Sequence, residues 1–335
     1  MVFPSPTHDV QIATAGEALI DLIQEADGRL RPCDGGAVYN LTRALGLQDV
    51  GTLYLNPLSR DRFGRGLAEG VTRAGVRLAR SEPAHQPTSL AVVSVDDAGK
   101  ASYSFYRDGV ADRQVDATQL NAACAAQTGL RAVVTGCLAL VPEDAHKYLP
   151  WLQEQHAAGR LVVVDANLRP AIVPDMPAYR ASVLAALQMA DLVKVSDDDL
   201  ALLGFDQPDP LEAARALLDH TPTRWIAVTL GPRGAALINR DGQTWRAAES
   251  QPVTVVDTVG AGDCFLAGLL VALLERPAMQ SIGHARQLQL NGADVEAMLA
   301  QAIASASLCV MRTGCQPPTR QEVLQRLAQS RPALA

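Results

Sequence analysis

Residues 257–263 read Asp-Thr-Val-Gly-Ala-Gly-Asp, and these residue types could hold a phosphate and act on it. Gly260, Ala261 and Gly262 form a turn of small residues, whose backbone N–H groups can face a ligand without side chains in the way. The next residues, 265–274, repeat large apolar side chains at helical spacing and predict a buried helix. The turn therefore lies at a helix N-terminus, where free N–H groups and the helix dipole favour a phosphate.

Asp263 stands at the same helix start, and two roles are open to it. A carboxylate there can be a plain N-cap or first-turn charge, which over all proteins is the commoner case. It can also accept the proton of a hydroxyl that attacks the phosphate held by the turn. The second role predicts a phosphoryl-transfer site.

Residues 35–40 could hold the hydroxyl-bearing partner. Gly35 and Gly36 leave a backbone with no side-chain wall, so a sugar can lie against it. Asn40 follows one turn into a predicted helix, and its amide can both donate to and accept from a diol. A pair of glycines alone usually marks only a turn.

Further polar residues follow buried strands. Asp165, Asn167 and Arg169 end the strand-like stretch RLVVVDANLRP, and open α/β sheets bind ligands at the carboxyl ends of their strands. Ser196 and Asp199 follow the next such strand, where they fit an N-cap with an acidic first turn.

The stretch DTVGAGDCFLAGLL closely resembles the DTxGAGD signature of the ribokinase/fructokinase (pfkB) sugar kinases. The resemblance covers about residues 10–320. It implies a three-layer α/β/α ribokinase-like fold with a mostly parallel central sheet and a small β-sheet lid, built from segments at about 18–34 and 88–110. Residues 1–9 would be a tail, and 321–335 the end of a terminal helix and a second tail. The lid also implies a homodimer.

The resemblance assigns residues to catalysis and to sugar binding. Asp263 would be the catalytic base, and Gly260, Ala261 and Gly262 the anion hole. The sugar would be held by six residues: Asp21, Gly35, Gly36, Asn40, Arg107 and Arg169. From the residues alone, Asp21 is more often a solvated acid at a strand end, and Arg107 could equally be a surface arginine after a strand. Tyr39 would either narrow the sugar pocket or point away from it.

The resemblance also implies ATP and Mg²⁺. The nucleotide residues would be Ser196, Thr229, Gly231, Gly234, Gly260 and Gly262. The family carries Asn-x-x-Glu where this chain has Ser196 and Asp199, so the shorter Asp199 would reach Mg²⁺ through water. The closing segment CVMRTGCQPPT and Asp257 imply a monovalent cation, K⁺, near the anion hole.

Composition narrows the partners and the compartment. The 335 residues carry a net charge of −7, which argues against nucleic acid or an anionic membrane as a partner. No signal peptide is visible, and the longest apolar run, 265–274, is about half the ~20 residues of a spanning helix. The six cysteines form no CxxC pair and no His/Cys ligand cluster by spacing, which favours reduced core thiols and a cytoplasmic location.

These observations predict an ATP-dependent kinase for a sugar's primary hydroxyl. Fructose is the leading acceptor because residues 87–113 look most like fructokinases; 2-keto-3-deoxygluconate is second, since Arg107 and Arg169 could meet a carboxylate. Ribose or a nucleoside is third. A non-catalytic sugar or nucleotide sensor is favoured only by the altered Ser196 and Asp199. A nicotinamide-dependent dehydrogenase would need a glycine fingerprint after the first strand, which GEALID does not supply.

Overall fold

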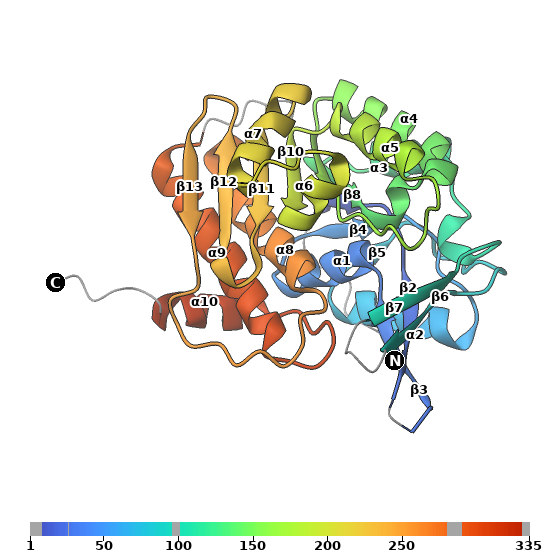
Figure 1. Cartoon of the computed structure of the whole chain (residues 1–335). Coiled ribbons are helices and arrows are strands. Elements are labelled where there is room, and N and C mark those ends of the chain that lie inside the picture. The colour runs from blue at the N-terminus through green and yellow to red at the C-terminus, as the bar shows by residue number, and fades with distance from the viewer. Residues whose placement is uncertain (1–8, 26, 96–100, 280–289, 330–335) are drawn as a thin grey trace.

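A nine-stranded sheet forms the centre of the computed structural model, which describes residues 9–25, 27–95, 101–279 and 290–329 (Figure 1). The strand order is β13-β12-β11-β10-β9-β8-β1-β4-β5. The strands are β1 (Ile12–Thr14), β4 (Thr52–Tyr54), β5 (Arg77–Leu78), β8 (Ala132–Gly136), β9 (Leu161–Asp165), β10 (Leu192–Ser196), β11 (Trp225–Thr229), β12 (Ala235–Asn239) and β13 (Thr244–Ala247). The pairs β11–β12 and β12–β13 are antiparallel and the other six pairs are parallel, so the sheet is mostly parallel as predicted.

Helices cover both faces of this sheet because its strands are apolar on both sides. In β8, Val133 packs into one core, whereas Ala132 and Val134 pack into the other. The first core is closed by α3 (Ala117–Ala125), α4 (Ala145–Ala157), α5 (Met176–Leu187), α6 (Asp197–Leu203) and α7 (Pro210–His220). The second core is closed by α1 (Ala37–Leu47), α8 (Ala261–Leu274) and α9 (Gly292–Val310). Two helix layers around a sheet are the predicted three-layer architecture.

The remaining elements lie outside these layers. Helix α2 (Arg62–Arg73) packs on α1, and α10 (Arg320–Gln329) packs on α9. Short 3₁₀ turns are η1 (Ala111–Arg113), η2 (Cys137–Leu140), η3 (Pro142–Asp144), η4 (Gly231–Arg233) and η5 (Pro277–Met279). The predicted tails at 1–9 and after 329 fall outside the described residues, apart from Asp9.

A second, four-stranded sheet stands apart from the first, at the lower right of Figure 1. It has the order β3-β2-β6-β7, formed by β2 (Leu19–Gln24), β3 (Leu30–Gly35), β6 (Ser89–Val95) and β7 (Ala101–Tyr106). The pair β2–β6 is parallel, while β2–β3 and β6–β7 are antiparallel. These strands lie almost wholly within the two segments for which the sequence predicts a lid.

Helix α8 holds the predicted phosphate turn in place. Every residue from Asp263 to Leu274 is buried, as expected for a helix that is apolar all round. It packs between α1 and α9, and a Cβ at Gly268 would lie only 2.7 Å from the backbone oxygen of Gln301 on α9. The N-terminus of α8 is therefore fixed by the core on both sides.

Helix α9 is the one helix among the described residues that is long and apolar enough to cross a membrane, by length and composition only. It has 19 residues, and Val295, Met298 and Leu299 pack into the core beneath the sheet. A core helix passes the same test.

Candidate active site

A cavity of about 350 Å³ opens between the small sheet and the N-terminus of α8. It collects predicted site residues from distant parts of the chain: Asp21, Gly36, Asn40, Arg169, Asp257 and residues 260–263. Gly35 lies directly behind its wall, since a Cβ there would come within 2.1 Å of the Asp21 carboxylate. The residues predicted for the sugar and for the anion hole thus share one cavity, except Arg107.

Asp263 is in the first turn of α8, and its carboxylate Oδ2 accepts a hydrogen bond from Asn40 Nδ2 at 2.9 Å. The two residues are 223 positions apart in the sequence. Burial raises the pKa of Asp263 to about 7, although the Asn40 hydrogen bond and the charges of Lys194 and Arg169 oppose the rise. A carboxyl group with this pKa is a competent base near neutral pH.

The turn before α8 has the geometry of an anion site. Gly260 is the N-cap with φ +79°, and no side chain caps the helix. The Ala261 N–H donates to the backbone oxygen of Thr258 at 3.2 Å, and the N–H groups of Gly262 and Asp263 have no capping side chain. Lys194 brings a cation to this turn, because a Cβ at Gly262 would lie 2.9 Å from its Nζ. Lys194 was not among the site residues predicted from the sequence.

Lys194 is almost fully buried in β10, where its Nζ lies 3.0 Å and 3.1 Å from the two carboxylate oxygens of Asp165. The two residues are register partners on adjacent parallel strands. A lysine inside the apolar strand Leu192–Ser196, near its carboxyl end, was the available clue.

Glu17 is the second missed residue. Its Oε1 accepts from the backbone N–H groups of Ala37 and Val38 at the start of α1, at 2.7 Å and 3.3 Å. Its Oε2 has no hydrogen-bond partner among the described residues, and burial raises the pKa of the carboxyl to about 7. The clue was a glutamate three residues after the end of the first strand, β1.

Asp21 and Arg169 face the cavity from different elements. Burial raises the pKa of Asp21 to about 6, and the positive charge of Arg169 opposes that rise. The Asn40 Oδ1 has no hydrogen-bond partner among the described residues. Buried polar atoms without partners fit a ligand that brings its own hydroxyl groups.

The directions of the Tyr39 and Arg107 side chains show whether each residue reaches the cavity. Tyr39 points away from the cavity, since it is fully buried and its hydroxyl donates to the backbone oxygen of Leu67 at 3.1 Å. Arg107 is not a cavity-lining residue, and it is not a surface arginine either. It is buried, 3.8 Å from Asp112 and within hydrogen-bond reach of the backbone oxygen of Leu138 at 3.4 Å.

Ser196 and Asp199 lie outside the cavity and border a separate hollow of about 450 Å³, which shares Arg169 with it. Asp199 forms a capping box with Ser196, and its Oδ1 accepts from the backbone N–H of Leu168 at 2.8 Å. Because its carboxylate already accepts several protein hydrogen bonds, Asp199 fits a contact to Mg²⁺ through water better than direct ligation.

Thr229, Gly231, Gly234 and Asp257 complete the predicted nucleotide and cation residues. Thr229, Gly231 and Gly234 form the β11–β12 hairpin and line neither hollow. Asp257 lines the cavity, and its Oδ2 accepts from the backbone N–H of Gly314 at 2.8 Å. Asp257 therefore ties the phosphate turn to the closing segment for which the resemblance implies K⁺.

Three cysteines form a cluster in the structure that their spacing in the sequence did not predict. Spacing in the sequence gave no ligand cluster, yet the Sγ atoms of Cys264, Cys309 and Cys315 all lie within 4.8 Å of one another. The packing of α8 against α9 brings them together, which spacing along the chain does not reveal.

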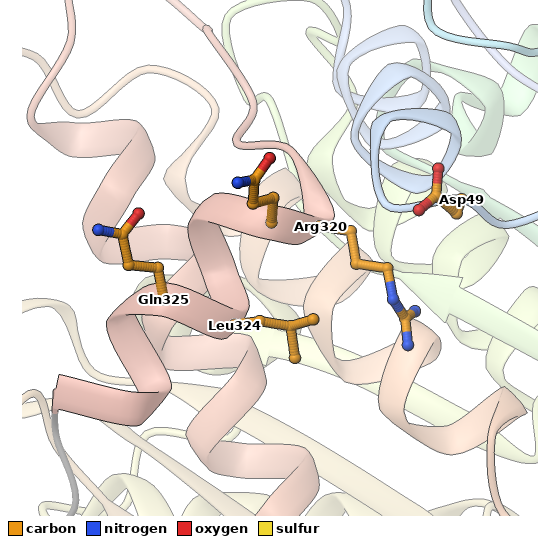
Figure 2. Close-up of a pocket in the computed structure, with 5 residues that line it drawn as sticks. Asp49, Arg320, Leu324 and Gln325 are labelled. Carbon is orange, nitrogen blue, oxygen red and sulfur yellow. The ribbon is translucent and has the colours of Figure 1, made fainter.

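A larger hollow, of about 650 Å³, lies between α10 and the residue Asp49 that follows α1 (Figure 2). Its two charged residues are Asp49 and Arg320, and Arg320 already pairs with Glu275. It shares no residue with the cavity and gathers no catalytic side chains.

A three-layer α/β/α body, a small separate sheet and a cavity between them, with Asp263 at a helix start, fit the sugar-kinase fold that the resemblance implies. Residues 10–322 match the pfkB family carbohydrate kinases. Over 269 residues the chain is 32% identical to the fructokinase of Rhizobium leguminosarum bv. trifolii, covering 78% of this chain and 79% of that protein.

Solved structures show the same fold. The fructokinase of Xylella fastidiosa with bound ATP has a TM-score of 0.80 at 24% identity, covering 96% of this chain and 98% of that one. The fructokinase of Vibrio cholerae O395 with fructose, ADP and calcium bound has a TM-score of 0.77 at 23% identity, covering 95% and 99%. The chain belongs to the pfkB family, and the predicted fold and enzyme class, an ATP-dependent carbohydrate kinase, are confirmed.

Proposed function

We propose that this protein transfers the γ-phosphoryl group of ATP to a primary hydroxyl of fructose, with Asp263 as the base. The observation that carries the proposal is the hydrogen bond between Asn40 and Asp263. Asn40, on α1, is the candidate sugar contact, and Asp263, on α8, is the candidate base. A sugar hydroxyl bound by Asn40 would therefore lie within reach of the Asp263 carboxylate.

Different parts of the cavity would bind the sugar and stabilise the transferred phosphoryl group. Asp21, Gly35, Gly36 and Asn40 hold the sugar from the small sheet and the start of α1. The backbone N–H groups of Gly260, Ala261 and Gly262 receive the charge of the moving phosphoryl group, and Lys194 and Arg169 add positive charge beside it. In phosphoryl transfer most of the catalysis is such positioning and electrostatic stabilisation.

The nucleotide would approach along the β11–β12 hairpin, with Thr229, Gly231, Gly234 and Ser196 nearest its phosphates. Mg²⁺ would supply charge neutralisation between phosphate oxygens, held through water by Asp199. Asp257 and the segment around Gly314 are the candidates for a K⁺ site, since they already meet through a hydrogen bond.

Charge in the cavity favours a neutral sugar over an acid. Two cationic side chains, Arg169 and Lys194, line it, and Lys194 already pairs with Asp165. The described lining includes five carboxyl groups: Glu17, Asp21, Asp34, Asp257 and Asp263. Because Arg107 faces Asp112 instead of the cavity, 2-keto-3-deoxygluconate would meet one cavity-lining arginine rather than two. Its carboxylate is therefore disfavoured, and the fructokinase relatives support fructose.

The test is an ADP-release assay with magnesium-ATP and a panel of acceptors: fructose, 2-keto-3-deoxygluconate, ribose, glucose, tagatose, adenosine and fructose 6-phosphate. We expect the highest kcat/KM with fructose. The Asp263→Asn variant should lose about 10²–10⁴-fold in kcat, the usual size of general-base help. A clear preference for another acceptor would contradict the substrate, and near-normal turnover by Asp263→Asn would contradict the base.

A further inference from the structure

Three cysteines meet directly behind the phosphate turn. Cys264 is in the first turn of α8, Cys309 is near the end of α9, and Cys315 is in the loop that leads to α10. Cys264 and Cys309 are fully buried, and Cys315 is 8% exposed. Their three Sγ atoms lie within 4.8 Å of one another, and none of the three is in a disulfide.

The ligand set is soft and contains three atoms. Among the described residues, no histidine, aspartate or glutamate joins the group. Mg²⁺ and Ca²⁺ prefer oxygen ligands, and structural zinc almost always takes four protein ligands. None of these three ions therefore matches a set of three sulfur ligands. Thiolates select soft ions. We propose that Cys264, Cys309 and Cys315 form a binding site for a thiophilic ion that takes three sulfur ligands, such as Cu(I) or trivalent arsenic.

The site has an access route and a route to the reaction. Cys315 lines the cavity, so an ion can reach the cluster from there. On the other side, a Cβ at Gly260 would lie only 2.2 Å from Cys315 Sγ, and Cys309 Sγ lies 3.6 Å from the backbone oxygen of Val259. The sulfur atoms thus contact the turn that we assign to the phosphate.

Binding needs no oxidant or reductant. With arsenous acid, three S–H groups react with As(OH)₃, three As–S bonds replace three As–O bonds, and three water molecules leave. Arsenic stays trivalent, and the product carries no net charge, which suits a buried site. With Cu(I), the thiols release their protons to solvent as Cu–S bonds form, and copper stays monovalent.

The direct test is titration of the reduced, full-length protein with buffered Cu(I) in one arm and with arsenite in the other. Native mass spectrometry gives the stoichiometry, and sulfur-to-ion charge-transfer absorption gives the affinity. We expect one ion per chain in at least one arm. Cys264→Ala, Cys309→Ala and Cys315→Ala should each bind at least tenfold more weakly, as expected when one of three ligands is lost.

Cys124→Ala is the matched control, because Cys124 is equally buried but packs in the other core, on α3. It should bind the ion like the wild type. Failure of both ions to bind would overturn the proposal, as would binding that survives in all three ligand variants. Equal loss of binding in Cys124→Ala would also overturn it.

A second readout rests on the proposed function. Because the sulfur atoms contact Gly260 and Val259, loading the site should lower kcat at least tenfold, and a small competing dithiol should restore it. The two ideas fail separately. Ion binding without any kinase activity would leave the site standing and remove the function, whereas kinase activity without ion binding would do the reverse.

Discussion

Burial and the hydrogen bond from Asn40 shift the pKa of Asp263 in opposite directions. Burial is the larger effect and raises the pKa to about 7. A base must be ionised to accept a proton, so kcat/KM should fall about tenfold per pH unit below that pKa and level off above it. A pH–rate profile from pH 5 to 9 measures this limb.

Glu17 is the control for that profile, since burial also raises its pKa to about 7 and it lines the same cavity. In Glu17→Gln the acid limb should stay in place, because Asp263 is unchanged. Disappearance of the limb in Glu17→Gln would assign it to Glu17 instead.

Glu17 should also make stability depend on pH. Its folded pKa of about 7 lies above the ordinary 4.5, so the folded state holds the proton more tightly than the unfolded chain. The stability from this protonation is fully present below pH 4.5 and is lost as pH rises through 7. The glutamine in Glu17→Gln cannot ionise.

Relative to Glu17→Gln, the wild type should therefore lose on the order of 3 kcal/mol in free energy of unfolding between pH 4.5 and 8. Chemical denaturation at both pH values measures the difference. Glu69→Gln, on the exposed side of α2, is the matched control. A wild-type protein that gains stability relative to Glu17→Gln as pH rises would contradict the sign.

At the scale of elements, two helical glycines should respond oppositely to alanine. Gly268 lies where α8 crosses α9, and a Cβ there would lie 2.7 Å from a backbone oxygen. Gly268→Ala should cost about 1–3 kcal/mol, because neither helix can give way in a packed core. At Gly66, on α2, a Cβ would meet nothing within 4 Å. Gly66→Ala should gain about 0.5–1 kcal/mol from helix propensity.

Urea denaturation of the two variants and the wild type gives both values. A stabilised Gly268→Ala would show that α8 and α9 are not held as closely as described. A destabilised Gly66→Ala would show that α2 has an unseen neighbour.

Elements were predictable because they depend on local pattern. The alternation of apolar strands and helices, and the turn residues 257–263, predicted the sheet, its covering helices and the position of the phosphate turn. The Ser196–Asp199 capping box also follows from four adjacent residues.

Features that depend on packing between distant elements were not predictable. Lys194 meets Asp165 only because β10 and β9 adopt one register. Arg107 and Tyr39 turn inward because buried partners, Asp112 and the Leu67 backbone, are available there. The three cysteines meet only when α8 packs on α9.

At the scale of the whole molecule, the small sheet is the candidate dimer surface. Two large apolar side chains on it are exposed, Leu30 at 47% and Tyr106 at 61%. If the sheet joins two copies, Tyr106→Arg should convert a dimer into a monomer, because a charge would be buried in the interface. Light scattering gives the mass directly.

Leu324→Arg is the control, since Leu324 is similarly exposed at 50% but lies on α10, away from the small sheet. It should leave the mass unchanged. A wild-type monomer would contradict the dimer, and a dimer disrupted by Leu324→Arg would place the interface elsewhere.

The hydrogen bond between Asn40 and Asp263 has a consequence for the order in which the protein matures. It closes a loop of 223 residues, and contacts so distant in sequence form late, because the entropy of closing the loop is lost before the contact stabilises anything. A nascent chain can complete the small sheet and all nine strands of the main sheet before α8 leaves the ribosome. Synthesis therefore passes through a period in which the residues proposed to bind the sugar exist without Asp263, the proposed base. Phosphoryl transfer becomes competent only after the last quarter of the chain has docked.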